Sequence, residues 1–330
     1  MKRVGGLWPG LVSWENIASA IHRAAAGKKS RPDVAEFLLA WELHAIELQR
    51  QLAAETYTPG TYRTFLVREP KPRMISAAPF RDRVVHHILT QVLEPIFEPR
   101  FAAQSYACRT ELGTHRALRA ASAACRRFPY VLQCDIRKYF HSIDHEILKV
   151  QLAHAVKCQP TLRLAAKIID GSNPQESVTA YFPGDTLFTP CERPRGLPLG
   201  NQTSQFFSNL YLNQFDQFVL RDLRPGAYCR YVDDFLIFHD SKDFLRDARQ
   251  QVQAQMDRLR LVLHEGKSRI YRTQDGITFL GWRLFPDHRL ELGRSCARIA
   301  SWNAHAAHGD TWRLREQLFA AHAFKVRGHS

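Results

Sequence analysis

Apolar residues stand three or four positions apart through much of residues 14–55, as in the series Phe37, Leu38, Trp41, Ala45, Leu48 and Leu52. This period places the apolar side chains on one face of a helix, so it predicts a helical N-terminal segment over residues 1–60. Residues 62–76 instead form two β-type runs joined by a Pro-rich turn that carries Lys71 and Arg73. These runs predict a hairpin with a positively charged face.

Helices and strands alternate through the middle of the chain. The pattern predicts a helix over residues 80–97, ending before Pro99, and an apolar strand over residues 129–136 with Asp135 near its end. A further helix is expected from near Asp144. Residues 170–195 contain four prolines and no sustained period, and they predict a loop-like insertion.

A long helix is expected after the tight turn at residues 195–201. Its apolar face carries Phe207, Tyr211, Phe215 and Phe218, and the polar residues expected largely on the opposite face are Asn209, Asn213 and Gln217. We interpret four acids of this half of the chain as helix caps, loop residues or helix-surface charges: Asp144, Asp170, Asp216 and Asp240. Farther on, the pattern predicts a helix over residues 246–261, strand-like segments near Leu263 and over residues 277–282, and a basic helical C-terminal region.

Two adjacent carboxylates, Asp233 and Asp234, lie between the short apolar runs of residues 230–238. Such runs pair as a hairpin and expose the charged turn between them. Neighbouring aspartates repel each other, and a cation beside them removes that repulsion. Aspartate also favours ordinary hairpin turns, so the dipeptide alone fits a metal site and a plain turn about equally well.

Composition narrows the class of protein. The chain has 330 residues, 45% of them hydrophobic, which is enough for about two folded domains. Its 46 Lys and Arg residues are spread along the whole length and give a net charge of +14. That distribution favours a polyanionic partner, although charge alone does not separate nucleic acid from an anionic membrane.

The cysteines and the apolar runs bear on location. Seven cysteines without a C-x-x-C pair favour neither a disulfide framework nor a zinc ribbon, and they fit a reducing compartment. The N-terminus lacks an apolar core of signal-peptide length, and no window approaches eighteen uncharged apolar residues. We therefore expect a cytoplasmic protein that does not enter the membrane.

Asp135 lies 98 residues before Asp233, so only folding can bring these strand-end aspartates together. In an α+β sheet with helices on one face, Asp135 would meet Asp233 and Asp234 at a shared divalent-ion site. Mg²⁺ prefers oxygen ligands and accepts one or two carboxylates plus substrate phosphates. Two such ions can activate a 3′-hydroxyl and stabilise a leaving pyrophosphate.

The order and context of these motifs resemble those of reverse transcriptases. Residues 135–140 and 231–234 are similar to the two catalytic motifs of that family. The resemblance implies an α+β right-hand polymerase fold made of the N-terminal helical segment (1–60), fingers (61–128), a palm (129–286) whose antiparallel sheet carries helices on one face, and a short basic helical thumb (287–330). It also implies an RNA-directed DNA polymerase that binds template RNA, the RNA/cDNA duplex and dNTPs.

The same resemblance assigns a role to each matched residue. The catalytic residues that it implies are Asp135, Asp233, Asp234 and Lys267, and the lysine would protonate the leaving pyrophosphate. Two Mg²⁺ ions, with Mn²⁺ as an alternative, are held by Asp135, Ile136, Asp233 and Asp234. The substrate-binding set comprises Lys71 and Arg73 on the triphosphate, Phe140 as a gate against a ribose 2′-hydroxyl, and Leu199, Gly200 and Gln205. The primer grip is Phe279, Leu280, Gly281 and Trp282.

Residues 196–205 narrow the resemblance further. Most reverse transcriptases have glutamine before the second glycine and proline after the serine, whereas Leu199 and Gln205 stand there in this chain. This departure resembles the enzymes of diversity-generating retroelements. It implies error-prone copying of a template-repeat RNA at adenines, for mutagenic retrohoming, and an oligomeric helical accessory variability protein as partner.

Two other interpretations remain. A retron, group II intron-like or defence-associated reverse transcriptase would share the carboxylates, although Leu199 and Gln205 argue against these groups. A non-catalytic RNA-binding protein on a polymerase scaffold would share the basic surface, but it has no need for all three aspartates.

Overall fold

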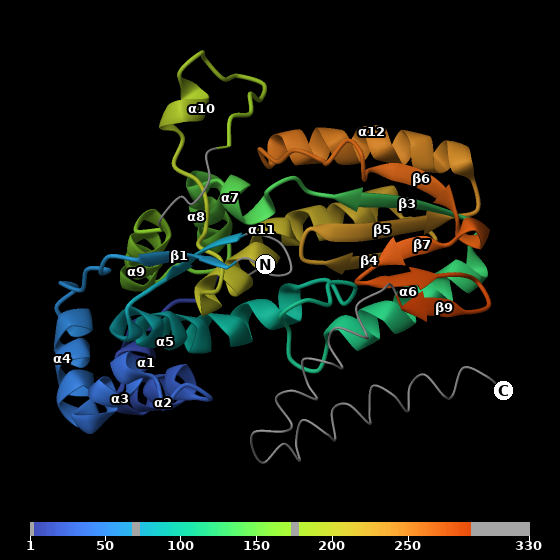
Figure 1. The fold of residues 1–330 in the computed structure, drawn as a ribbon. Coiled ribbons are helices and arrows are strands. Elements are labelled where there is room, and N and C mark those ends of the chain that lie inside the picture. The colour runs from blue at the N-terminus through green and yellow to red at the C-terminus, as the bar shows by residue number, and fades with distance from the viewer. Residues whose placement is uncertain (1–2, 68–72, 173–177, 292–330) are drawn as a thin grey trace, which may run out of the picture.

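The computed structural model describes residues 3–67, 73–172 and 178–291. The N-terminal segment consists of four helices, α1 (Trp8–Leu11), α2 (Trp14–Ala25), α3 (Pro32–Leu39) and α4 (Trp41–Ala53), which lie beside the long helix α5 (Phe80–Phe97) (Figure 1). The Ser13 side chain accepts a hydrogen bond from the Asn16 backbone and so caps α2. The helices expected within residues 14–55 and over residues 80–97 are therefore present.

The predicted hairpin of residues 62–76 is also present. Strand β1 (Arg63–Val67) pairs antiparallel with β2 (Arg73–Ala77), with Phe65 opposite Ile75. Lys71 and the side chain of Arg73 lie outside the described residues, so the fold does not place the two cations expected on the turn.

An antiparallel sheet in the order β4-β5-β3-β6 lies within residues 129–286, the region expected to be the palm. Its strands are β4 (Ala227–Tyr231), β5 (Asp234–His239), β3 (Tyr130–Asp135) and β6 (Arg269–Arg272). Helices α11 (Gln202–Phe218) and α12 (Lys242–Arg258) pack on one face. Helix α6 (Thr114–Arg127) and a second sheet, β7 (Ile277–Phe279), β8 (Trp282–Leu284) and β9 (Arg289–Glu291), cover the other (Figure 1). The predicted α+β class is confirmed.

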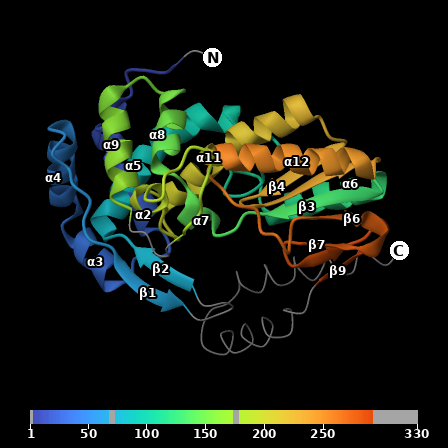
Figure 2. The same cartoon turned by 90° about the horizontal axis from the view of Figure 1, so that it is seen from above.

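The strand residues alternate between two hydrophobic clusters, as a sheet covered on both faces requires. Leu132, Phe235 and Ile237 pack into the large cluster with α11 and α12. Val131, Leu236 and Phe238 pack into a smaller cluster with α6 and the β7–β9 sheet. Figure 2 shows this second sheet and the β1–β2 hairpin on the same side of the molecule, at opposite ends.

The remaining elements of the described residues are η1 (Glu98–Arg100), α7 (Tyr139–Ser142), α8 (His145–Ala153), α9 (Gln159–Asp170), α10 (Thr189–Glu192), the π-helical turn η2 (Val219–Leu223) and η3 (Thr273–Asp275). Asp144 caps α8 as predicted, because its carboxylate accepts from the backbones of Glu146 and Ile147. Residues 178–195 are loop-like except for α10, and Arg193 pairs with Asp185 inside this segment. No helix in the described part of the chain is long and apolar enough to cross a bilayer.

Several local expectations were wrong. The polar face expected for α11 is buried at Asn209, and Asp216, expected to be a helix-surface charge, is 0% exposed. Both side chains have internal partners: the Asn209 amide donates to the Ala107 carbonyl, and Asp216 pairs with Arg230. Helix α12 (Lys242–Arg258) begins before residue 246 and ends before residue 261, the two limits expected for it. The strand-like structure expected over residues 277–282 is present, as part of the β7–β8 hairpin. Of the expected C-terminal helical region, residues 287–291 include β9, and residues 292–330 lie outside the described residues.

Candidate active site

The three aspartates meet where β3 ends and the β4–β5 hairpin turns. Asp135 and Asp234 are direct partners across the β3–β5 ladder. Tyr231 pairs with Asp234 in the hairpin, so Val232 and Asp233 form its two-residue turn. The Ile136 amide donates a hydrogen bond to the Asp233 carbonyl over 3.1 Å, which ties this turn to the end of β3. Strand register thus brings together residues that lie far apart in the sequence.

Asp135 and Asp234 share the sheet face that carries Val131 and Leu236, because side chains alternate along a strand. The β7–β8 hairpin lies on this same face, and the Gln133 amide donates to the Thr278 carbonyl over 2.8 Å. Its turn is made by Leu280 and Gly281, which both have positive φ, as a tight two-residue hairpin turn requires. Of the four residues predicted as a primer grip, Phe279 is fully buried in the smaller hydrophobic cluster.

Among the three aspartates, Asp234 has a strongly raised pKa. Burial, together with the neighbouring carboxylates of Asp135 and Asp233, raises its pKa from 3.8 to about 7. Its Oδ1 atom is buried and has no hydrogen-bond partner among the described residues. A buried carboxylate oxygen without a donor, beside two other carboxylates, is the environment in which a divalent cation is favourable.

Lys267 compensates part of this negative charge. Its Nζ lies 2.8 Å from Oδ2 of Asp135, and the His264 amide holds the lysine-bearing loop on the Asp135 carbonyl over 2.7 Å. Residues 3–67, 73–172 and 178–291 contain no group of three His, Cys, Asp or Glu side chains arranged to hold a metal ion. Ile136 has a buried hydrocarbon side chain, so its backbone carbonyl is the oxygen that it can offer.

The loop at residues 196–201 connects the palm to the hairpin β1–β2. The Leu197 amide donates to the Phe140 carbonyl over 2.7 Å, and the Asn201 side chain donates to the Tyr62 hydroxyl over 3.2 Å. Gly200 has a φ of +101°, and a Cβ at this position would lie 3.8 Å from the Ile75 side chain. Leu199 and Gly200 thus lie on a loop that Leu197 ties to Phe140, and the half-buried Phe140 side chain packs against the large hydrophobic cluster.

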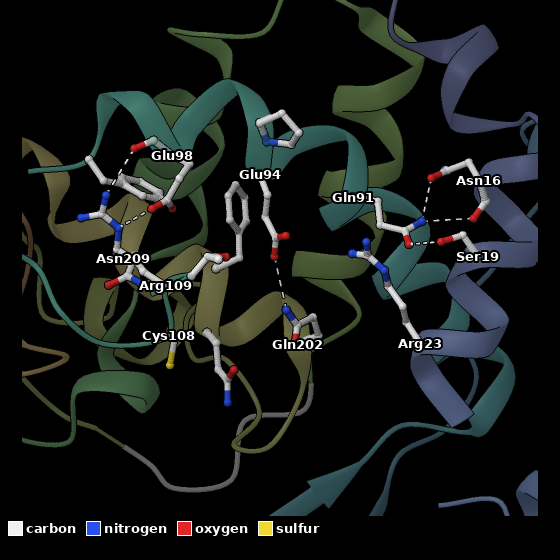
Figure 3. Close-up of a pocket in the computed structure, with 15 residues that line it drawn as sticks. Asn16, Ser19, Arg23, Gln91, Glu94, Glu98, Cys108, Arg109, Gln202 and Asn209 are labelled. Atoms are coloured by element: carbon white, nitrogen blue, oxygen red, sulfur yellow. Dashed lines mark hydrogen bonds and ion pairs between the residues drawn. The ribbon is translucent and has the colours of Figure 1, made fainter. Parts of the chain in front are cut away.

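Gln205 lies apart from this group. It lines a cavity of about 540 Å³ between α2, α5 and α11 whose walls include none of the three aspartates (Figure 3). The walls are polar: Gln202 donates to Glu94, and Gln91 donates to Asn16. Leu199, which was expected to share a substrate-binding set with Gln205, is not among the residues that line this cavity.

Sequence reasoning missed the buried polar groups beneath the Val232–Asp233 turn. Arg230 is 1% exposed and binds Asp216 through two hydrogen bonds, of 2.7 and 2.6 Å. Tyr228 donates to the same carboxylate over 2.6 Å. An arginine within an otherwise apolar strand was the available signal, but its partner lies on another element, and only the fold shows it.

Comparisons with known proteins agree with this geometry. The family model of Reverse transcriptase (RNA-dependent DNA polymerase) matches residues 67–284. Protein YkfC of Escherichia coli K12 is 26% identical over an alignment of 283 residues that covers 73% of this chain and 71% of that protein. The group II intron-encoded protein LtrA of Lactococcus lactis is 24% identical over 216 residues, which cover 64% of this chain and 33% of LtrA.

A solved structure of apo telomerase from Candida tropicalis, truncated from its C-terminal domain, aligns with a TM-score of 0.47 and 13% identity, over 70% of this chain and 54% of that one. The chain spans about a third of the length of LtrA, with 33% covered. The family match includes all three aspartates and most of the chain. The chain belongs to the reverse transcriptase family and has the α+β right-hand polymerase fold expected from its sequence.

Proposed function

We propose that this protein is an RNA-directed DNA polymerase that extends a primer with dNTPs on an RNA template. The observation that carries the proposal is the pairing of Asp135 with Asp234 across β3 and β5, with Asp233 at the adjoining turn. Three carboxylates at one strand end have no use in a simple RNA-binding scaffold, because their mutual repulsion costs stability unless a cation offsets it.

The residues of the site fit Mg²⁺, with Mn²⁺ as an alternative. Asp135, Ile136, Asp233 and Asp234 would hold the ions, which when bound supply Lewis-acid activation of the primer 3′-hydroxyl and neutralise charge on the phosphates. Lys267 leaves Asp135 and donates a proton to the departing pyrophosphate. Lys71 and Arg73 bind the triphosphate, and Phe140 excludes the ribose 2′-hydroxyl. Leu280 and Gly281 hold the primer end on the face that carries Asp135 and Asp234.

Primer extension tests this proposal. The full chain, given a primed RNA, dNTPs and Mg²⁺, should form cDNA, and Asp233→Ala should abolish the product while RNA binding persists. Affinity for the RNA should fall steeply as salt rises, since phosphate contacts release counterions. Equal product from wild type and Asp233→Ala would refute the assignment of the catalytic acids, and affinity independent of salt would refute the basic RNA-binding surface.

For the biological setting, we propose a diversity-generating retroelement in the cytoplasm, with template-repeat RNA as substrate and an accessory variability protein as partner. Leu199 supports this proposal. It lies in the loop between Phe140 and the β1–β2 hairpin, where a glutamine amide would offer hydrogen bonds and a leucine offers only contact. A misplaced nucleotide then loses fewer interactions, so discrimination between correct and incorrect pairs should weaken.

The error spectrum tests that setting. Leu199→Gln should lower misincorporation opposite template adenine, and Leu199→Met, which keeps an apolar side chain of similar size, should leave it high. An unchanged spectrum in Leu199→Gln would refute the role of Leu199.

A group II intron-type enzyme is the second candidate, because LtrA is encoded by such an intron. A template and variable repeat pair with an accessory gene beside this gene would favour the retroelement, and flanking intron sequence would favour the second candidate.

A further inference from the structure

Beneath the catalytic turn lies a buried polar cluster that the proposed chemistry does not use. Its members are Asp216 on α11 and Tyr228 and Arg230 on β4, which are 0%, 5% and 1% exposed. The guanidinium binds both carboxylate oxygens of Asp216, and the Tyr228 hydroxyl donates to one of them. All three side chains are therefore held in fixed positions.

The remaining guanidinium nitrogen, Nη1, points to the turn. It donates to the Val232 carbonyl over 2.9 Å, and it lies 3.5 Å from Oδ1 of Asn209. The Val232 carbonyl belongs to the peptide that links Val232 to Asp233, so this hydrogen bond fixes the orientation of the peptide unit from which Asp233 begins. The next carbonyl, of Asp233, is held by the Ile136 amide. Each carbonyl of the turn thus has a donor.

The turn needs such support because its conformation is unfavourable. Val232 has a φ of +58°, in the left-handed region that a β-branched residue rarely adopts. Hairpin turns that require positive φ normally place glycine, asparagine or aspartate there. A strained residue of this kind persists only where the surroundings impose it, and such residues concentrate at functional sites.

A simple stabilising role does not account for the arrangement. A buried ion pair is a weak source of stability, because the desolvation of both charges offsets their attraction. Lysine would supply the same charge to Asp216, but its single nitrogen cannot span the carboxylate and the Val232 carbonyl as a planar, three-nitrogen guanidinium does. The contact that requires arginine is the one to the turn.

We infer that Arg230, fixed by Asp216 and Tyr228, is a positioning residue that holds the strained Val232 turn and so aims the Asp233 carboxylate. The inference rests on the proposed polymerase function for its kinetic consequences. It makes α11 part of the catalytic apparatus through a carboxylate that does not itself contact the reacting groups.

The test compares Arg230→Lys with Arg193→Lys in the full chain. Arg193 is a matched control, since it is also a nearly buried arginine with aspartate partners, Asp144 and Asp185, and neither partner belongs to the turn. Primer extension should show kcat reduced by about 10- to 100-fold in Arg230→Lys, the loss expected from misplacing a catalytic group by about 1 Å. The KM for dNTP should stay unchanged, and Arg193→Lys should keep the wild-type kcat.

Two further measurements separate positioning from folding. Hydrogen–deuterium exchange of the peptide covering residues 230–238 should be faster in Arg230→Lys than in wild type or Arg193→Lys. Adding Val232→Gly, which removes the penalty of positive φ, should restore part of the lost kcat. If Arg230→Lys does not fold, Tyr228→Phe replaces it, with the same signature and a smaller effect, because it removes one hydrogen bond to Asp216.

The outcomes are distinct. Equal kcat and equal exchange in Arg230→Lys and Arg193→Lys would overturn the inference, as would a loss of kcat without faster exchange at the turn. A wild-type protein that makes no cDNA would refute the proposed function, and the exchange comparison would still decide whether Arg230 holds the turn.

Discussion

Replacing Asp234 with asparagine should stabilise the metal-free protein at neutral pH. Burial and the carboxylates of Asp135 and Asp233 raise the Asp234 pKa from 3.8 to about 7, so the folded state holds this proton more tightly than the unfolded chain. The stability that this group contributes is complete below pH 3.8 and is lost as the pH rises through about 7. At about 1.4 kcal/mol per pKa unit, the loss by neutral pH reaches about 4 kcal/mol.

Urea unfolding in EDTA at several pH values between 4 and 8 measures this effect. The stability advantage of Asp234→Asn over wild type should grow as the pH rises and level off near pH 8, because asparagine does not ionise. Mg²⁺ should then stabilise wild type more than the variant. A difference in unfolding free energy that is constant across the pH range, or one that favours wild type at pH 8, would refute the electrostatic reasoning.

Asp216→Asn is the matched control for this experiment. Asp216 is also a buried aspartate of the palm, but it is paired with Arg230. Its replacement leaves a buried guanidinium without a counter-charge, which should cost about 3–5 kcal/mol at every pH of the series. If Asp234→Asn raises the free energy of unfolding and Asp216→Asn lowers it, the charge of the neighbouring groups, and not burial alone, decides how much each carboxylate affects stability.

Three other substitutions test further features. His86→Gln should reduce the loss of stability between pH 6.5 and 4, because burial lowers the His86 pKa to about 3 and the unfolded chain therefore takes up a proton before the folded protein does. Urea midpoints at both pH values measure this effect, and Thr90→Val is a control whose cost should not depend on pH. Phe235→Ala should cost about 3–5 kcal/mol, since its fully buried ring packs 5.0 Å from that of Phe215; urea unfolding that shows a loss below about 1 kcal/mol would contradict this packing. Lys267→Met should slow single-turnover primer extension with little change in melting temperature, because the lysine side chain is 53% exposed, and an unchanged rate would exclude proton donation by Lys267.

Much of the fold follows from local sequence. The helical period in residues 14–55, the Ser13 and Asp144 caps, and the β-type runs around Asp233 each carry their own signal, because spacing and capping are properties of neighbouring residues. Helix α6 was not predicted, although Ala117, Leu118 and Ala121 stand at helical spacing.

The candidate site divides in the same way. Sequence alone selected the residues of the site: three strand-end aspartates and Lys267 predict a cation-dependent reaction on phosphates, because few other residue types suit it. Tertiary structure decided what each of these groups experiences. The β3–β5 register pairs Asp135 with Asp234, and Lys267 forms an ion pair with Asp135. Gln205 lines a cavity whose walls include none of the three aspartates.

Burial is the property that only the fold could assign. Asp216 and Asp234 are both aspartates of the same region. No local sequence pattern shows that one carboxylate is paired with an arginine and that the other has a raised pKa. That difference depends on which charges approach from distant elements: Arg230 binds Asp216, whereas Asp234 faces Asp135 and Asp233. Sequence determined which groups are present, and packing determined which of them are compensated, because electrostatic free energy depends on distance and solvent access.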